Sequence, residues 1–212
     1  MTTRTGTRRR LSRHERREQL LEAARDAFAE RGYHATAMDD IADRAGVSKP
    51  VLYQHFASKD DLYLGLLDVQ TERLVRLVEE ALAATEDNAD RVAGAVAAYF
   101  AFVDQEDAGY RLVFASDLAA DPEVRERLDR CVDACAGAIA RTIRADTGLP
   151  PEEAQLLGVA LTGLAQASAE HWVTAGRPVP RERAAELVAQ VAWRGLGGLP
   201  LARVEASGTS SG

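Results

Sequence analysis

The stretch that decides the fold covers residues 36–62 and reads TAMDDIADRAGVSKPVLYQHFASKDDL. Its apolar residues recur at helical spacing, and Gly46 is typical of the residue that ends a short helix. Ser48 can cap a second short helix, where Pro50 fits the first turn because the N–H that it lacks would have no helical partner there. Two short helices joined by a tight turn predict a helix-turn-helix, although a helical hairpin within a core has the same spacing.

The second short helix divides its side chains between two faces. Leu52 and Phe56 are four residues apart and can bury together. The other side chains then point elsewhere and combine hydrogen-bond donors, a tyrosine and apolar groups; they are Lys49, Pro50, Val51, Tyr53, Gln54 and His55. Such a surface suits the major groove of DNA, where it can meet base edges, thymine methyl groups and phosphates.

Charge is divided unevenly along the 212-residue chain, whose formal net charge is -7. Residues 1–60 hold 12 basic and 9 acidic side chains, whereas the remainder holds 14 basic and 24 acidic ones. Within residues 1–17, seven arginines accompany a single glutamate. A basic head on an acidic body favours DNA binding by the head over a simple core hairpin.

Apolar residues recur at helical spacing along the rest of the chain, and no strict alternation is long enough to predict a strand. We therefore predict an all-α protein with a three-helix head and a helical body. About nine helices are expected. They cover residues 12–32, 36–45, 48–56, 58–84, 91–106, 110–118, 122–147, 152–176 and 181–196.

Several function classes find little support in the sequence. The four histidines are scattered, and neither G-x-S-x-G nor H-E-x-x-H occurs, so we expect no catalytic site, no metal site and no cofactor. The longest stretch without a charged residue, 154–169, is shorter than the ~20 apolar residues that a bilayer requires. Because a signal-peptide pattern is also missing, we expect a cytoplasmic protein with no membrane partner.

Two cysteines, Cys131 and Cys135, lie four residues apart on one face of an expected helix. Their number excludes a disulfide scaffold, and without a neighbouring histidine they fall short of a zinc ligand set. Burial as small apolar residues is the simpler interpretation, and redox sensing is the alternative.

From Met38 onward, the opening stretch resembles the DNA-binding region of TetR-family regulators. The resemblance covers residues 13–67 and includes Arg31-Gly32-Tyr33 at the end of the first helix. It implies three N-terminal helices that bind DNA, a long fourth helix leading into a ligand-binding body, and two C-terminal helices that form a homodimer. The function that it implies is that of a ligand-responsive transcriptional regulator, not an enzyme, that binds palindromic operator DNA.

Short motifs in the body resemble family members that regulate fatty acid synthesis and respond to long-chain acyl-CoA. These motifs are GYRLVF at 109–114, DPEV at 121–124, AW at 192–193 and LPL at 199–201. The division that we expect is a flexible arginine-rich arm at 1–11, a helix-turn-helix domain at 12–57, a ligand-binding and dimerisation domain at 58–203, and a disordered tail at 204–212.

The resemblance also assigns roles within the head. The residues expected to contact DNA are Thr36, Ser48, Lys49, Pro50, Val51, Tyr53, Gln54, His55 and Lys59. Lys49, Pro50, Val51 and Gln54 match positions that approach bases, and the others match phosphate-contacting positions or lie at a helix start. A solvated surface charge at Lys59 and a core position for Tyr53 are the structural alternatives.

An apolar and aromatic run at 92–103 predicts a ligand pocket in the body, and a plain packed core is the alternative. The lining residues that we expect are Tyr99, Phe100, Phe102, Val103, Tyr110, Phe114, Cys131 and Cys135. A body of this size argues against an architectural DNA-binding protein without a ligand. We expect a small apolar effector, an acyl-CoA or a fatty acid. The acidic body keeps open a lipophilic cationic drug, as sensed by regulators of efflux pumps.

Small residues on the eighth expected helix allow a second helix to approach closely. Together with larger apolar residues of the last two helices, they form the dimer surface that we expect. Its members are Leu156, Ala160, Gly163, Leu164, Ala167, His171, Trp172, Leu187, Val191 and Trp193. The implied partners are therefore double-stranded DNA, a small apolar effector and a second copy of the chain.

Overall fold

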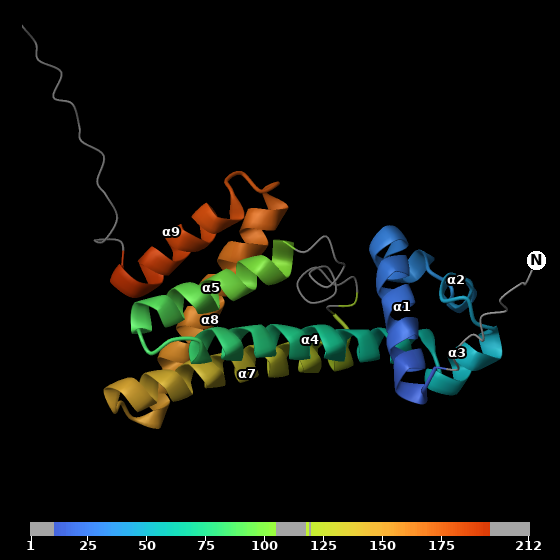
Figure 1. Ribbon diagram of the computed structural model, residues 1–212, viewed down its shortest axis with the longest axis horizontal. Coiled ribbons are helices and arrows are strands. Elements are labelled where there is room, and N and C mark those ends of the chain that lie inside the picture. The colour runs from blue at the N-terminus through green and yellow to red at the C-terminus, as the bar shows by residue number, and fades with distance from the viewer. Residues whose placement is uncertain (1–10, 105–117, 119, 196–212) are drawn as a thin grey trace, which may run out of the picture.

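The computed structural model describes residues 11–104, 118 and 120–195, and these residues form α-helices without any strand. The all-α prediction is confirmed. The helices are α1 (Arg13–Ala35), α2 (Met38–Arg44), α3 (Lys49–His55), α4 (Lys59–Ala83), α5 (Asn88–Asp104), α7 (Pro122–Thr147), α8 (Pro151–Thr174) and α9 (Arg181–Arg194) (Figure 1). The expected helix at 110–118, apart from its last residue, lies outside the described residues, as do the tail and all but the last residue of the arm.

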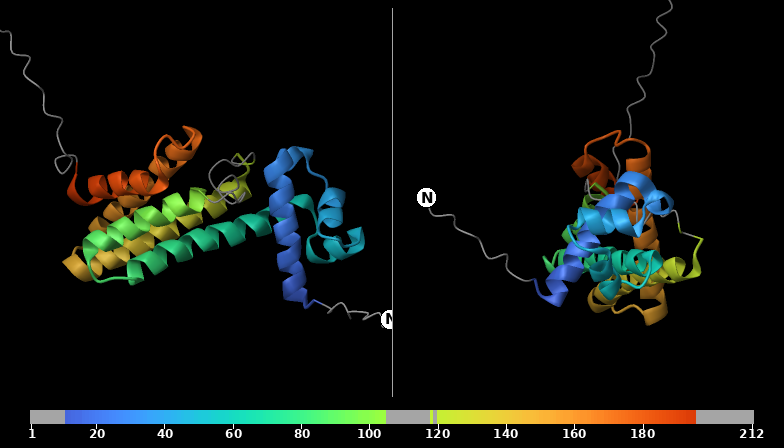
Figure 2. Two further views of the ribbon diagram at one scale, coloured as in Figure 1. Left: turned by 45° about the horizontal axis from the view of Figure 1, so that its top comes forward. Right: turned by 90° about the vertical axis from the view of Figure 1, so that its right-hand side faces the viewer.

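Three helices, α1 to α3, pack into the head at one end of the molecule (Figures 1 and 2). Ser12 begins α1 with a capping box, because its hydroxyl accepts from the Glu15 N–H and the Glu15 carboxylate accepts from the Ser12 N–H. Gly46, at φ +63°, makes the turn between α2 and α3. Leu52 and Phe56 are fully buried in the head, so α3 presents its opposite face to solvent.

The long helix α4 joins the head to the body. Its 25 residues span about 37 Å at the α-helical rise. Ser58 caps it by accepting a hydrogen bond from the Asp61 N–H. The buried Leu62 and Leu66 lie in its first third, near the head, whereas Leu74 and Val78 lie farther along, where α5 and α7 pack against the helix.

The body is a layered bundle of α4, α5, α7, α8 and α9 (Figure 1). Asp121 begins α7 by accepting hydrogen bonds from two backbone N–H groups, and Gly148 ends it at φ +69°. The helices α7 and α8 pack tightly at Gly158, where a Cβ would lie 2.3 Å from the Ala136 carbonyl oxygen. In the described part of the chain, no helix has the length and apolar character needed to cross a membrane.

Candidate nucleic-acid interface and ligand pocket

The exposed face of α3 carries most of the side chains expected to reach bases. Lys49, Pro50 and Gln54 are exposed, Tyr53 is 42% exposed, and Val51 is half-buried. Ser48 occupies the N-cap position with extended backbone, but its side chain makes no capping hydrogen bond. The surface of α3 therefore offers donors and small apolar groups side by side, as a major-groove reader requires.

Lys49 already has an intramolecular partner. Its Nζ lies 2.8 Å from Asp39 Oδ1 and 3.1 Å from Oδ2, and both side chains are exposed. The hydrogen bond to Asp39, followed by the charge of that carboxylate, raises the pKa of Lys49. To contact a base or a phosphate, this ammonium must leave or share Asp39.

Lys59 and Thr36 make hydrogen bonds inside the head. Lys59 Nζ donates to the carbonyls of Tyr33 (3.0 Å) and Thr36 (3.1 Å), and it lies 4.2 Å from the centroid of the Tyr33 ring. Thr36 is buried, and its Oγ1 lies 2.8 Å from the Gly32 carbonyl. Lys59 therefore caps the end of α1, and its role at phosphates stays a prediction.

A cationic hollow lies where the start of α1 meets the end of α3. It is lined by Arg13, His14, Arg17 and His55. Arg17 lies over the Phe56 ring, with its guanidinium carbon 4.3 Å from the ring centroid, and its Nη1 is 3.4 Å from the His55 carbonyl oxygen. Burial, followed by the positive charges of the α1 arginines, lowers the pKa of His55. These α1 arginines were not among the predicted contacts, although their spacing of three and four residues indicates a common helical face.

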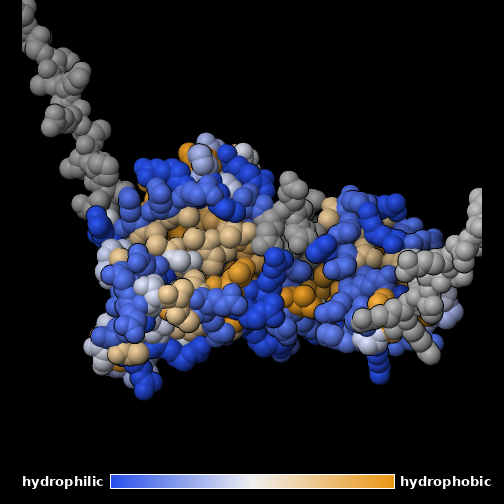
Figure 3. Space-filling model, viewed as in Figure 1, coloured by the Kyte–Doolittle hydropathy of each residue, from blue (hydrophilic) through white to orange (hydrophobic). Residues whose placement is uncertain are grey.

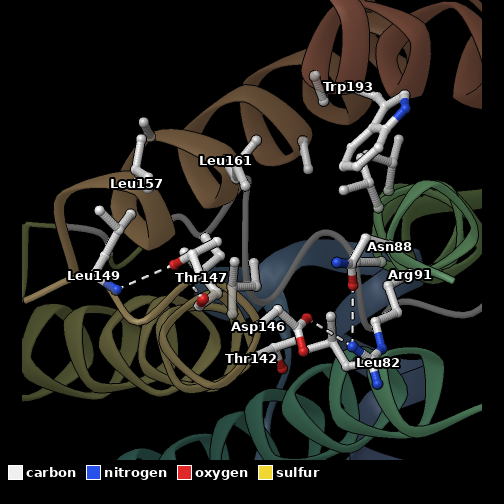
Figure 4. A pocket seen from close by; sticks show the side chains of 18 of the residues that line it. Leu82, Asn88, Arg91, Thr142, Asp146, Thr147, Leu149, Leu157, Leu161 and Trp193 are labelled. Carbon is white, nitrogen blue, oxygen red and sulfur yellow. Dashed lines mark hydrogen bonds and ion pairs between the residues drawn. The ribbon is translucent and has the colours of Figure 1, made fainter. Parts of the chain in front are cut away.

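A cavity of about 420 Å³ lies in the body, beside Leu82 at the end of α4 that is farthest from the head. Figure 4 shows the side chains that line it. Its volume falls within the usual ~300–1,000 Å³ of small-molecule sites. The walls are mostly apolar. The lining residues are Leu82, Asn88, Arg91, Val92, Ala95, Val96, Tyr99, Ile139, Thr142, Ile143, Asp146, Thr147, Leu149, Leu157, Ala160, Leu161, Ala165, Ala192 and Trp193.

The expected pocket residues are distributed between this cavity, the core and a second hollow. Tyr99 lines the cavity, whereas Phe100, Phe102 and Val103 are buried outside its lining. Cys131 lines a separate groove between α4 and α7. Two further expected residues, Tyr110 and Phe114, lie outside the described residues.

The two cysteines are buried free thiols, and Cys135 connects them to the cavity wall through Tyr99. Cys131 Sγ donates to the Thr71 carbonyl oxygen at 3.7 Å, and the neighbouring Cys135 thiol, together with burial, raises the pKa of Cys131. The Cys131 thiol in turn lowers the pKa of Cys135, and burial raises the pKa of the Tyr99 hydroxyl.

Sequence reasoning missed the residues at the helix ends that close the cavity. Asn88 is the first residue of α5, and the others lie in the last turns of their helices: Leu82 in α4, Asp146 in α7 and Trp193 in α9. No signal in the sequence marked this set, because the four residues belong to four different helices and come together only through packing.

Most of the expected dimer residues lie on accessible parts of α8 and α9. Leu156 is 69% exposed and Trp193 is 50% exposed. Ala160, Gly163, Ala167 and His171 are also exposed, and Leu164, Leu187 and Val191 are half-buried. Trp172 instead is buried, packs edge-on against Phe100 and donates from Nε1 to the Val179 carbonyl.

On the face shown in Figure 3, apolar side chains gather over α5 between α4 and α9, whereas the head is mainly hydrophilic.

Comparison with known proteins assigns the family. Residues 20–66 match the bacterial regulatory proteins of the tetR family, and residues 89–195 match the tetracyclin repressor-like C-terminal domain. The chain is 46% identical over 194 residues to the HTH-type transcriptional activator FasR of Mycolicibacterium smegmatis, covering 92% of this chain and 89% of that protein. The chain belongs to the TetR family. This TetR-family chain is a transcriptional regulator, which confirms the expectation that it is not an enzyme.

Solved structures share the TetR fold of the chain. A TetR-like regulator from Rhodococcus sp. RHA1 is 30% identical, with a TM-score of 0.66 over 90% of this chain and 100% of that one. FadR from Bacillus subtilis, solved in complex with stearoyl-CoA, is 20% identical, with a TM-score of 0.69 over 84% of this chain and 98% of that one.

Proposed function

We propose that this TetR-family regulator binds palindromic operator DNA as a homodimer and that an apolar effector in the body changes its affinity for DNA. The effector that we propose is a long-chain acyl-CoA. The observation that carries this proposal is the mostly apolar cavity, whose wall includes Leu82 in the last turn of α4. Because α4 begins at Lys59 in the head, one helix links the ligand pocket to the DNA-binding face.

At the DNA, Lys49, Pro50, Val51 and Gln54 read bases, and Ser48, Tyr53, His55 and Lys59 position the head on phosphates. The side chain of Thr36 is buried and stays inside the head. The exposed outer face of α3 supports this division. In a symmetric dimer the two copies of α3 enter successive major grooves, ~34–36 Å apart. The head therefore corresponds to residues 12–57 and the body to residues 58–203, with the arm at 1–11 adding phosphate or minor-groove contacts.

The homodimer forms through α8 and α9. Apolar side chains that are costly to leave in water support this surface, among them Leu156, Val159 and Trp193. A Cβ built at Gly163 meets nothing within 4 Å in the monomer, so this part of α8 leaves room for a second helix.

The apolar lining and the similarity to FasR support an acyl effector. FadR of Bacillus subtilis, which shares the fold, was solved with stearoyl-CoA. Binding can change DNA affinity only if the effector favours one spacing of the two heads over another. A change in the tilt of α4 supplies such a difference, because α4 contacts both the head and the cavity-lining helices.

A lipophilic cation is the second candidate, and Asp146 in the lining is the observation that favours it. Arg91 lies 2.7 Å from Asp146 and compensates this charge, so we rank the cation below the acyl chain. Direct binding of dodecyltrimethylammonium and dodecanoyl-CoA to the purified protein separates the two candidates.

Selection of bound sites from random double-stranded DNA tests the operator. We expect an inverted repeat, and Gln54→Ala should relax the preference at one base pair by about 1–3 kcal/mol if the amide binds its base in a bidentate way. Sedimentation of the DNA-bound protein should give two chains per site. A single chain on a site without symmetry would contradict the proposal.

A further inference from the structure

The polar end of the cavity is built around Arg91. Its Nε donates to the Thr85 carbonyl at 2.8 Å, and its Nη1 donates to Asn88 Oδ1 at 3.0 Å and to Asp146 Oδ2 at 2.7 Å. The Arg91 and Asp146 side chains are only 19% and 28% exposed. Arg91 thus ties the α4–α5 connection and the start of α5 to the end of α7.

These bonds fix the orientation of the Asn88 amide. A guanidinium can only donate hydrogen bonds, so the side of Asn88 that faces Arg91 must be its carbonyl oxygen. The Asn88 nitrogen is then turned away from Arg91, towards the side of the cavity where Leu161 and Thr147 lie (Figure 4). Its two N–H groups have no acceptor within the described part of the chain, and Asn88 can therefore donate to a ligand.

Charge at this end of the cavity is balanced. Asp146 neutralises Arg91 at 2.7 Å, so an entering ligand meets amide donors beside an ion pair of zero net charge. An uncharged carbonyl oxygen can accept from Asn88 without disturbing the ion pair. A carboxylate in the same place gains no net attraction from the pair, because Asp146 offsets the positive charge of Arg91, and it still loses its hydration on entering a partly buried site.

We propose that Asn88 binds the carbonyl oxygen of an esterified acyl chain and that Asp146 discriminates against the free fatty acid. This inference rests on the proposed function, because it assumes an acyl chain in the apolar part of the cavity. It assigns specificity to the pair of Asn88 and Asp146, with Arg91 as the residue that positions both.

Direct binding of methyl dodecanoate and dodecanoate, measured by calorimetry at pH 7.5, tests the inference, because the two ligands differ at the head group alone. Asp146→Asn should tighten dodecanoate binding at least about tenfold and change methyl dodecanoate by less than about threefold. Asn88→Ala should weaken methyl dodecanoate about tenfold by removing the donor.

Asp104→Asn is the matched control. Asp104 pairs with Arg177 at 2.9 Å, has a 27% exposed side chain and lies outside the cavity lining, so this variant makes the same charge change elsewhere. It should leave both affinities unchanged. Arg91→Gln removes a positive charge from the cavity, whereas Asp146→Asn removes a negative one. Arg91→Gln should therefore weaken the binding of dodecanoate and strengthen the binding of dodecylammonium.

The outcomes distinguish the inference from the proposed function. If both ligands bind but neither Asp146→Asn nor Arg91→Gln alters their affinity ratio, the discrimination is overturned and the acyl effector stands. If none of the three ligands, methyl dodecanoate, dodecanoate and dodecanoyl-CoA, binds the unmodified protein, the proposal of an acyl effector is wrong. The inference about Asn88 and Asp146 is then wrong as well.

Discussion

Gly158→Ala should destabilise the protein, although alanine is the better helix former. Gly158 lies in α8, and a Cβ built there would be 2.3 Å from the Ala136 carbonyl oxygen and 3.2 Å from the Ala140 Cβ. Ordinary contacts lie at 3.4–4 Å, so the two helices must separate by roughly 1 Å. The closest obstacle is backbone in the interior of α7, which cannot turn aside as a side chain can.

The magnitude follows from two opposing effects. Overpacking a helix contact typically lowers the free energy of unfolding by about 1–3 kcal/mol, and replacing glycine by alanine within a helix raises it by about 1 kcal/mol. Because the obstacle is rigid, we take the upper part of the overpacking range and expect a net loss of about 1–2 kcal/mol, or about 3–6 °C in Tm. Displacement of α8 should also weaken ligand binding, since Leu157 and Leu161 line the cavity.

Urea unfolding followed by circular dichroism at one fixed protein concentration measures this loss. Gly137→Ala on α7 is the matched control, because its nearest heavy atom is Arg141 Nη1 at an ordinary 3.6 Å. The control should gain about 0.5–1 kcal/mol from helix propensity. If Gly158→Ala stabilised the protein as much as Gly137→Ala, the close approach of α7 and α8 would be refuted.

Three further predictions concern the head. Lys59→Ala should lower the free energy of unfolding by about 1–3 kcal/mol, because two carbonyls at the end of α1 lose a charged donor. If the ammonium also reaches a phosphate, the slope of log Kd for DNA against log salt concentration should become shallower by about one unit. Asp39→Asn should raise affinity for DNA in anisotropy titrations, since it releases the Lys49 ammonium from a competing carboxylate and removes a negative charge that repels DNA; an unchanged affinity would contradict this. A nearby phosphate should raise the lowered pKa of His55, so the protein takes up a proton when it binds DNA. The affinity for DNA should therefore rise from pH 8 to pH 6, and His55→Gln should abolish this pH dependence.

Local signals were sufficient to predict the helices and the faces of α3. Ser12, Asp121 and Gly148 are cap residues whose effect depends on neighbours within four positions, and each acts at a helix end in the structure. Leu52 and Phe56 likewise predicted the buried face of α3 from their spacing alone. Such features depend on chain-local geometry, which a sequence displays directly.

The cavity could not be placed in this way, because apolar spacing indicates burial without distinguishing a cavity wall from solid core. Tyr99 lines the cavity, while Phe100 and Phe102 in the same run lie outside its lining. The polar end depends on Arg91 and Asp146, which are 55 residues apart and meet through the packing of α5 and α7. No local pattern in the sequence encodes that meeting.

The central claim is that a ligand in the cavity sets the affinity of the head for DNA. Titration of the operator complex with acyl-CoAs of increasing chain length, followed by fluorescence anisotropy, tests it most directly. Ala95→Phe fills the cavity from α5, and Ala97→Phe adds the same volume on the same helix outside the lining.

Long-chain acyl-CoA should change operator affinity at least about fivefold in the unmodified protein and in Ala97→Phe, with an effect that grows with chain length. Ala95→Phe should bind the operator normally and fail to respond. A response that is independent of chain length, or that is the same in Ala95→Phe and Ala97→Phe, would contradict the account.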